Sequence, residues 1–262
     1  MLHTPSLFCR CRAQLAKHGM RFGSSSMGLS KEKYANPALC AGLGTHHVPM
    51  KIATDENLRG LGFVVKDPQD FTVANKRFEI EPWPTKGWRQ LDPGTGDEAG
   101  TTEGKFDIYW DGDFLFGKNH TIATAANHYL LGYAKEPALC QRSAPGVAPS
   151  SSPTHISLWY SDYHPDGGQL FYPEDGQPFV TNLAPPKGDD IQPQDFCAFY
   201  VPPGYGVYIH PGVWHNAVYT HPETGTWRTF FNRQGKVHAR VSVNWAEEFQ
   251  CMLQVPLKKP EA

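Results

Sequence analysis

The sequence of 262 residues predicts an all-β protein, a sandwich or barrel with few helices. Its composition combines 25 glycines, 23 prolines and 13% aromatic residues with only 19% charged residues. That mixture is typical of short strands joined by tight turns, because surface helices need more Glu and Lys. From residue 155 onward, short apolar runs follow one another with Pro, Gly or Asp at most of the breaks. No GxGxxG or GxxxxGK[ST] pattern is present, which argues against a nucleotide-binding α/β fold.

The charge balance and the cysteine spacing limit the class of partner and the redox state. A formal net charge of −2 gives no global field that would attract nucleic acid or an anionic membrane. No run of eighteen apolar residues exists, so we expect no segment that spans a bilayer. The cysteines contain no CxxC pair and indicate reduced, structural thiols. They are Cys9, Cys11, Cys40, Cys140, Cys197 and Cys251.

The first 27 residues differ from the rest of the chain. Basic residues alternate with apolar ones there, and no acidic residue precedes Glu32. This pattern is typical of an organelle transit peptide; a disordered basic tail, or translation that begins at Met27, explains it as well. We therefore expect a cytoplasmic or mitochondrial protein. Residues 1–45 are interpreted as a leader or disordered extension, and 46–262 as a single domain with an expanded 66–150 region.

Local patterns predict the individual elements. Residues 51–65 predict a strand, a short helix capped by Thr54 or Asp55, and a second strand. Residues 106–116 predict a hairpin around Asp111-Gly112. Residues 121–133 fit either a helix or a strand, whereas 93–104 and 141–153 are expected to be loops. The later strands are expected in HISLWYSDYH, GQLFYP, QPFVTNLA, DFCAFYVP, GVYIH, VWHNAVY, TWRTFFN and KVHARVSVNW.

Two segments about 40 residues apart carry the candidate chemistry. Residues 204–219, GYGVYIHPGVWHNAVY, place His210 and His215 on either side of a Pro-Gly turn, where they can converge. Strand alternation puts Tyr208 on the same face as His210. The other segment, DYHPDGGQLFYPEDG at 162–176, contains an Asp, a His and a Gln. Histidines that simply pack in the core would explain the pattern too.

The two segments resemble the signatures of a known family. HPDGGQLFYPEDGQPFV (164–180) and GVYIHPGVWH (206–215) are similar to the two signature segments of the ureidoglycolate lyase family, and 51–65 is more faintly similar to its first unit. The resemblance implies an all-β, cupin-like β-barrel of the jelly-roll type, with a few short helices and an N-terminal extension. The family's Asp-Arg-Gly-Gly at the end of a late strand is not matched; Asn232-Arg233 or Asn244-Trp245 stands there.

This resemblance implies elimination of urea from ureidoglycolate to give glyoxylate, a reaction of allantoin and purine degradation. Such a reaction needs a base, an acid and donors for a carboxylate, roles that histidine and arginine suit. The expected catalytic residues are His210, His215 and Tyr208, and the expected substrate-binding residues are His164, Gln169, Arg228 and Arg233.

The cupin resemblance also implies a possible metal site. Its residues would be Asp162, His164, Gln169 and His215, although a neutral Gln in place of Glu weakens cation binding. The expected cofactor is therefore none or one divalent metal ion. A metal-dependent cupin oxygenase or isomerase, and a non-catalytic cupin that binds a small organic acid, are the alternatives. The expected partner is a small-molecule ureide, with no nucleic acid and no membrane. A homodimer with a second copy of the chain is left as an open alternative.

Overall fold

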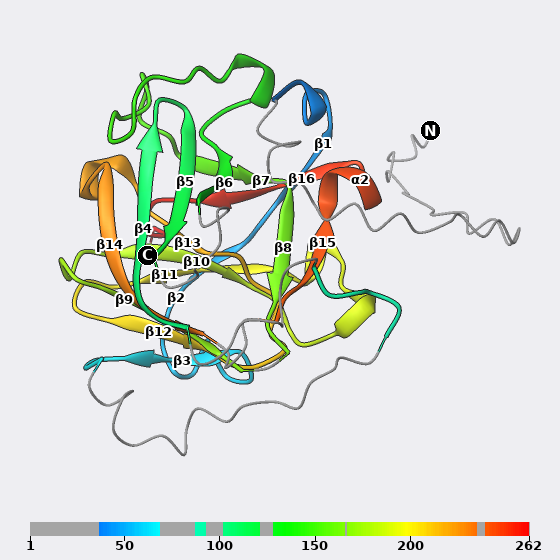
Figure 1. The fold of residues 1–262 in the computed structure, drawn as a ribbon, viewed down its shortest axis with the longest axis vertical. Coiled ribbons are helices and arrows are strands. Elements are labelled where there is room, and N and C mark those ends of the chain that lie inside the picture. Colours follow the sequence, from blue (N-terminus) through cyan, green and yellow to red (C-terminus); the bar gives the residue numbers. More distant parts are fainter. Residues whose placement is uncertain are drawn as a thin grey trace, which may run out of the picture.

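The computed structural model describes residues 37–68, 87–92, 102–120, 128–165, 167–234 and 239–261. Strands dominate these residues, as predicted, and the largest sheet has ten of them (Figure 1). In spatial order the sheet consists of β1 (Gly44–His47), β16 (Cys251–Pro256), β7 (His155–Leu158), β6 (His128–Tyr133), β5 (Phe114–Asn119), β4 (Thr102–Asp111), β14 (Trp227–Gln234), β9 (Gln169–Pro173), β12 (Gly206–Ile209) and β3 (Gly62–Val65).

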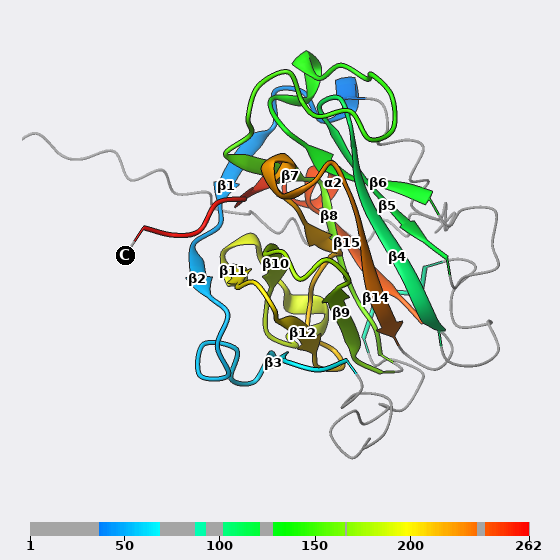
Figure 2. The same ribbon diagram turned by 90° about the vertical axis from the view of Figure 1, so that its left-hand side faces the viewer.

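Two smaller sheets form the opposite wall. One contains β13 (Val218–Tyr219), β10 (Phe179–Leu183), β11 (Cys197–Val201) and β2 (Met50–Ile52), and the other pairs β15 (Val241–Asn244) with β8 (Tyr160–Tyr163). Isolated bridges join Asp162 to His215 and Ala184 to Trp214, so the segment that leads into β13 connects the two sheets. In Figure 2, β4, β5, β6 and β14 form one side, and β10 and β11 lie across from them.

Short helices occupy the connections between strands. They are η2 (Pro37–Leu39), η3 (Pro137–Leu139), η4 (Gly188–Asp190), η5 (Pro193–Asp195), η6 (Pro222–Thr224) and α2 (Trp245–Glu248). In the described residues no helix has the length and apolar character needed to cross a membrane.

Aromatic side chains fill the space between the walls. The ring centroid of Phe106 lies 5.6 Å from that of Phe171, edge to face, and Phe179 of the smaller sheet lies 5.2 Å from Phe230 of the larger one. Edge-to-face pairs at this spacing are a favoured aromatic geometry. The two walls therefore share one core, which confirms the all-β, cupin-like fold.

The predicted hairpin at 106–116 is confirmed as β4 and β5. Gly112 adopts a left-handed φ of +58° in the turn, and a Cβ there would lie 2.3 Å from the backbone oxygen of Gln141. Glycine is therefore required both by the turn and by the neighbouring chain. Residues 141–153 form the expected loop, which is attached to the hairpin where Ser143 N donates to Asp111 at 2.8 Å.

The short helix predicted within 51–65 is wrong. After β2 the chain makes a single turn, in which Leu58 N donates to Thr54 O and Asn57 N donates to Thr54 Oγ1. Thr54 does cap this turn, but Gly60 adopts a left-handed φ of +81° and ends it before a helix can propagate. The ambiguous segment becomes β6 from His128 onward, while 121–127 lies outside the described residues.

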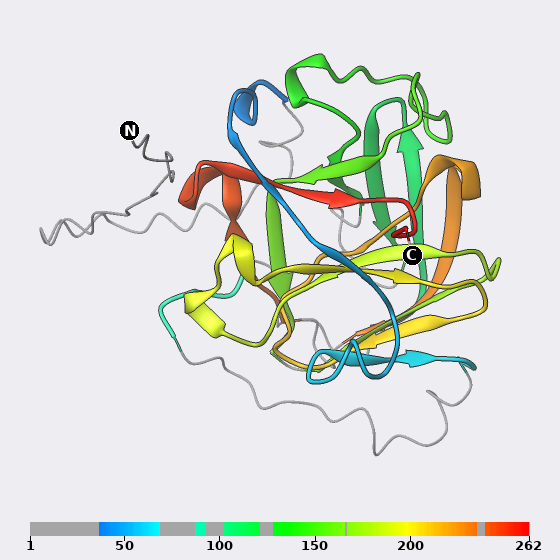
Figure 3. The same cartoon turned by 180° about the vertical axis from the view of Figure 1, so that it is seen from behind.

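The N-terminal part of the described chain contributes strands to both walls. β1 pairs in parallel with β16, and β2 pairs in parallel with β11; Figure 3 shows this segment crossing the back of the molecule. β1 begins at Gly44, so the leader interpreted as 1–45 overlaps its first two residues. Most of that leader, and residues 93–101 of the expected loop, lie outside the described residues.

The cysteines that the structure describes are free thiols, as predicted. Burial raises the pKa of the Cys40 thiol and raises that of Cys251 to about 11. Thiols with raised pKa values are poor nucleophiles, which fits a structural role. The described free cysteines are Cys40, Cys140, Cys197 and Cys251; Cys9 and Cys11 lie outside the described residues.

Candidate active site

Two histidines converge on Gln169 inside the barrel. Gln169 begins β9 and pairs with Ile209 of the core, so its side chain leaves the inner face of the sheet. His164 follows β8, and His215 lies in the segment before β13. The Nε2 atoms of His164 and His215 lie 3.1 and 2.9 Å from Gln169 Oε1. All three residues are less than 5% exposed, so the cluster is closed to bulk water.

The backbone fixes the tautomer of both imidazoles. Nδ1 of His164 lies 2.8 Å from Ala239 O, and Nδ1 of His215 lies 2.8 Å from Val213 O. Because a carbonyl oxygen can only accept, each Nδ1 carries the proton, and in its neutral form each ring presents the lone pair of Nε2 to Gln169. Burial, followed by the electrostatic interaction with His164, lowers the pKa of His215 to about 3, which keeps this imidazole neutral near pH 7.

The amide of Gln169 is oriented by Asn232. Gln169 Nε2 donates to Asn232 Oδ1 at 2.9 Å, which turns Oε1 toward the imidazoles. Lone pairs on Gln169 Oε1 and on the Nε2 atoms of His164 and His215 then face one another, and a cation between them would bind all three. Without a cation, a half-turn of both amides lets Gln169 donate to the histidines. Asn232 Nδ2, which has no partner among the described residues, can then donate to Gln169.

Asp162 adds a carboxylate to this cluster. Its backbone exchanges two hydrogen bonds of 2.7 Å with His215, and its Oδ1 lies 4.0 Å from His215 Nε2. Ligand atoms of Asp162, His164 and His215 all lie within 4.8 Å of one another. Behind Asp162, Arg240 Nε lies 3.8 Å from its Oδ2 and 2.5 Å from Asp92 Oδ2.

The donor set fits a divalent cation. Neutral imidazole nitrogens whose other ring nitrogen donates to a carbonyl are the usual histidine ligands, and amide and carboxylate oxygens suit borderline or hard ions. Adjacent ligand atoms in an octahedral shell with bonds of about 2.1 Å lie about 3 Å apart. The distances of 3.1 and 2.9 Å from Gln169 Oε1 to the two histidine Nε2 atoms match this separation. A divalent ion would change the net charge of Asp162, Asp92 and Arg240 from −1 to +1.

Two expected catalytic residues lie outside this cluster. Tyr208 and His210 share a face of the β12 region, as predicted, but that face is the outer one: Tyr208 pairs with Leu170, and its ring lies 5.0 Å from that of Phe63. His210 packs 5.8 Å from the same Phe63 ring. The expected convergence of His210 with His215 is therefore wrong, because the Pro-Gly turn directs the two side chains to opposite faces of the wall.

The expected arginines are also placed elsewhere. The Arg228 side chain is 1% exposed and forms a bidentate pair with Asp175, at 2.7 and 2.8 Å, while it also donates to the carbonyls of Gln177 and Pro178. Through these bonds Arg228 holds the connection between β9 and β10 in place, which is a structural role. Arg233 pairs with Leu170, so it lies on the same outer face as Tyr208. Neither arginine reaches the cluster around Gln169.

Sequence reasoning missed Asp92, Arg240 and Asn232 as members of the site. Asn232 was noted only as one of two asparagines that stand in for the family's Asp. Arg240 and Asp92 come from segments about 150 residues apart, and no local spacing relates them. Strand alternation around β15 could have indicated this contact. Arg240, just before the strand, and Ser242 within it share a face, and both donate to Asp92 Oδ2.

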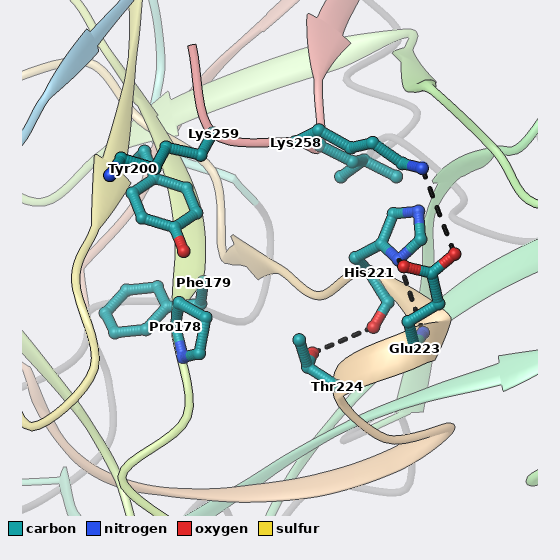
Figure 4. A pocket seen from close by; sticks show the side chains of 9 residues that line it. Pro178, Phe179, Tyr200, His221, Glu223, Thr224, Lys258 and Lys259 are labelled. Atoms are coloured by element: carbon teal, nitrogen blue, oxygen red, sulfur yellow. Dashed lines mark hydrogen bonds and ion pairs between the residues drawn. The ribbon is translucent and has the colours of Figure 1, made fainter. Parts of the chain in front are cut away.

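A hollow elsewhere on the surface shares no residue with the site. This cavity of about 140 Å³ is drawn in Figure 4. His221 lies at its edge, where its ring nitrogen caps η6 by accepting from Glu223 N at 3.3 Å. Its lining residues are Pro178, Phe179, Tyr200, His221, Glu223, Thr224, Leu257, Lys258 and Lys259.

The fold and the cluster together define a class: a cupin-like β-barrel with a buried site of two histidines, a glutamine and an aspartate. Within that class, the family model for ureidoglycolate lyase matches residues 116–251, about half of the chain. The chain therefore belongs to the ureidoglycolate lyase family.

Curated relatives match over a shorter stretch. The chain is 40% identical over 60 residues to ureidoglycolate lyase 2 of Rhizobium meliloti (strain 1021), which covers 23% of this chain and 36% of that protein. It is 36% identical over 66 residues to the ureidoglycolate lyase of Azotobacter vinelandii, covering 25% and 39%. The matched part thus spans less than two fifths of the length of either relative.

Proposed function

We propose that this protein is a lyase that eliminates urea from ureidoglycolate and releases glyoxylate, as a step of allantoin and purine degradation. The observation that carries the proposal is the convergence of His164, His215 and Gln169 beside Asp162, inside a barrel of the ureidoglycolate lyase family. Family membership favours this reaction over that of a cupin oxygenase or isomerase, and over simple binding of an organic acid.

The reaction moves one proton within the substrate. The hydroxyl O–H breaks as a carbonyl forms, the carbon–nitrogen bond breaks, and the departing urea nitrogen gains a proton. A single group can accept the first proton and deliver the second. Asp162 is the carboxyl group of the cluster and suits this task, whereas the lowered pKa of His215 makes that imidazole a weak base.

The remaining residues bind and orient. A divalent cation held by His164, Gln169 and His215 would supply Lewis-acid stabilisation of the substrate oxygens. The backbone carbonyls at Ala239 and Val213 hold the two rings in place, and Asn232 holds the amide. Because the site is buried, it excludes water that would otherwise compete for the glyoxylate carbonyl, and would do the same for a cation held there.

The test uses the full chain, since residues before 46 contribute to β1. Glyoxylate, urea and ammonia are quantified from ureidoglycolate, after chelator treatment and after addition of Mg²⁺, Mn²⁺, Ni²⁺ or Zn²⁺. A lyase gives equal amounts of glyoxylate and urea above the rate without protein, and no ammonia. His215→Ala should lose this activity, while His221→Ala at the surface cavity is the matched control and should keep it. Ammonia in place of urea, or no release with any ion, would refute the proposal.

A further inference from the structure

Two buried tyrosine hydroxyls beside Asp162 have no hydrogen-bond partner among the described residues. Tyr160 is 2% exposed and Tyr219 is fully buried, and the hydroxyl oxygens of both are unpaired. Burying an O–H group without a partner costs free energy, so natural proteins rarely leave one unpaired without a reason such as a missing ligand. We call Tyr160 and Tyr219 the tyrosine pair.

The tyrosine pair lies near Asp162 of the proposed active site. Tyr160 lies two residues before Asp162 on β8, so both side chains leave the strand on one face. Tyr219 comes from β13, which continues the segment that contains His215. Both tyrosines lie close enough to Asp162 to interact with its carboxyl group, and a phenolic hydroxyl is protonated at neutral pH and can donate.

The chemistry of the surrounding groups indicates what these donors bind. His164, His215, Gln169 and Asp162 present acceptor atoms to the interior, so they can meet a cation or the N–H groups of a ureide. A carboxylate accepts hydrogen bonds only and must find donors elsewhere. The tyrosine pair supplies two such donors next to the cluster, without adding a charge that would have to be neutralised when the site is empty.

We propose that the hydroxyls of Tyr160 and Tyr219 bind the carboxylate of the substrate, which selects small α-substituted carboxylates and places the reacting carbon beside Asp162. This inference rests on the proposed lyase function for the identity of the substrate. The sequence does not predict this role for either tyrosine, because each stands in an apolar run in which an aromatic residue predicts packing. The hydroxyls are specificity-determining groups, and the proton transfer remains with Asp162.

The experiment measures binding of ureidoacetate, which has the carboxylate and the ureido group but lacks the hydroxyl and so cannot react. Dissociation constants are obtained by calorimetry for the full-length, cation-loaded wild type, Tyr160→Phe, Tyr219→Phe and the double variant. Each Phe variant removes one donor and keeps the ring, and should weaken binding at least about tenfold. Tyr133→Phe is the matched control, because Tyr133 is fully buried but its hydroxyl contacts Cys40 Sγ; it should bind like the wild type.

A second probe tests which end of the ligand the hydroxyls contact. The primary amide of ureidoacetate lacks the negative charge, so its binding should change much less between the wild type and the Phe variants. Thermal unfolding without ligand should be unchanged or shifted upward in both Phe variants, because no bond is lost. Equal losses for acid and amide, unchanged binding of the acid, or a clear fall in Tm would each overturn the assignment.

The outcomes separate this inference from the proposed function. If the wild type binds ureidoacetate through the tyrosine pair but releases no urea from ureidoglycolate, the lyase proposal fails and the carboxylate site stands. If the wild type releases urea but does not bind ureidoacetate, or binds it equally well in the double variant, the lyase proposal stands and the role of the tyrosine pair is refuted.

Discussion

Removal of the Asn232 side-chain amide should release Gln169 from its orientation. Asn232 is fully buried, and its Oδ1 accepts the 2.9 Å bond from Gln169 Nε2. Asn232→Ala deletes this partner and leaves one buried atom of the Gln169 amide unpaired, Nε2 with a cation bound or Oε1 after the half-turn without one. The matched control is Asn182→Ala, because Asn182 is also fully buried but both of its amide atoms lack a partner among the described residues.

The expected magnitude follows from that difference. Both substitutions delete the same atoms and create similar cavities, so their common cost cancels in the comparison. Asn232→Ala additionally leaves the Gln169 amide unpaired, which should lower the free energy of unfolding by about 1–3 kcal/mol more than Asn182→Ala does. Loss of a group that orients a ligand should also weaken divalent-cation binding by about 10- to 100-fold.

Two assays check these expectations. Guanidinium denaturation of the metal-free proteins gives the unfolding free energies, and titration of a divalent ion against a chromophoric chelator gives the affinities. The stability difference does not depend on a bound cation. If Asn232→Ala and Asn182→Ala lose the same stability and bind the ion equally well, then Asn232 does not orient Gln169 and the reasoning is wrong.

Three further outcomes are expected. Gln169→Glu adds a negative charge facing both imidazoles and should tighten divalent-cation binding at least about tenfold in the same titration; weaker binding would contradict the ligand role. Glyoxylate release should persist within about twofold in His210→Ala but fall at least about 100-fold in His215→Ala, and equal losses would contradict the outer-face placement of His210. Burial raises the pKa of Asp175, but hydrogen bonds from Arg228 lower it, and the result is a pKa below the ordinary value. The ion pair therefore stabilises the fold above about pH 4 and is lost as pH falls through the lowered pKa, so the stability advantage of wild type over Asp175→Asn should shrink in acid; a constant difference would rule this out.

The strands after residue 155 could be predicted because each one combines β-forming residues with a Gly, Pro or Asp break. The turn at 54–61 was predicted as a helix, since capping signals describe the first turn but not whether a helix propagates beyond it. β1 and β16 pair across nearly the whole chain, and their short runs carry little local signal. Strand pairing at that distance depends on tertiary contacts that a sequence window does not contain.

The prediction of the site is limited in the same way, by contacts between segments that are distant in the sequence. His164, Gln169 and His215 were found because the family resemblance fixes their spacing, and the structure brings them together. His210 was expected with them because it also flanks the Pro-Gly turn, but alternation gives only the face it shares with Tyr208 and not which face is interior. Arg240 acts through Asp92, a contact between distant segments that the sequence alone could not supply.

The parallel pairing of β1 with β16 has a consequence for how the chain folds. Gly44 and Cys251 are partners although they lie roughly 200 positions apart, and closing such a loop costs about 5 kcal/mol of chain entropy before the sheet compensates for it. Contacts of such high sequence separation slow folding. Until β1 and β16 meet, each presents an unpaired edge to any neighbouring chain, so dilution and chaperones should favour the folded barrel over aggregates during refolding.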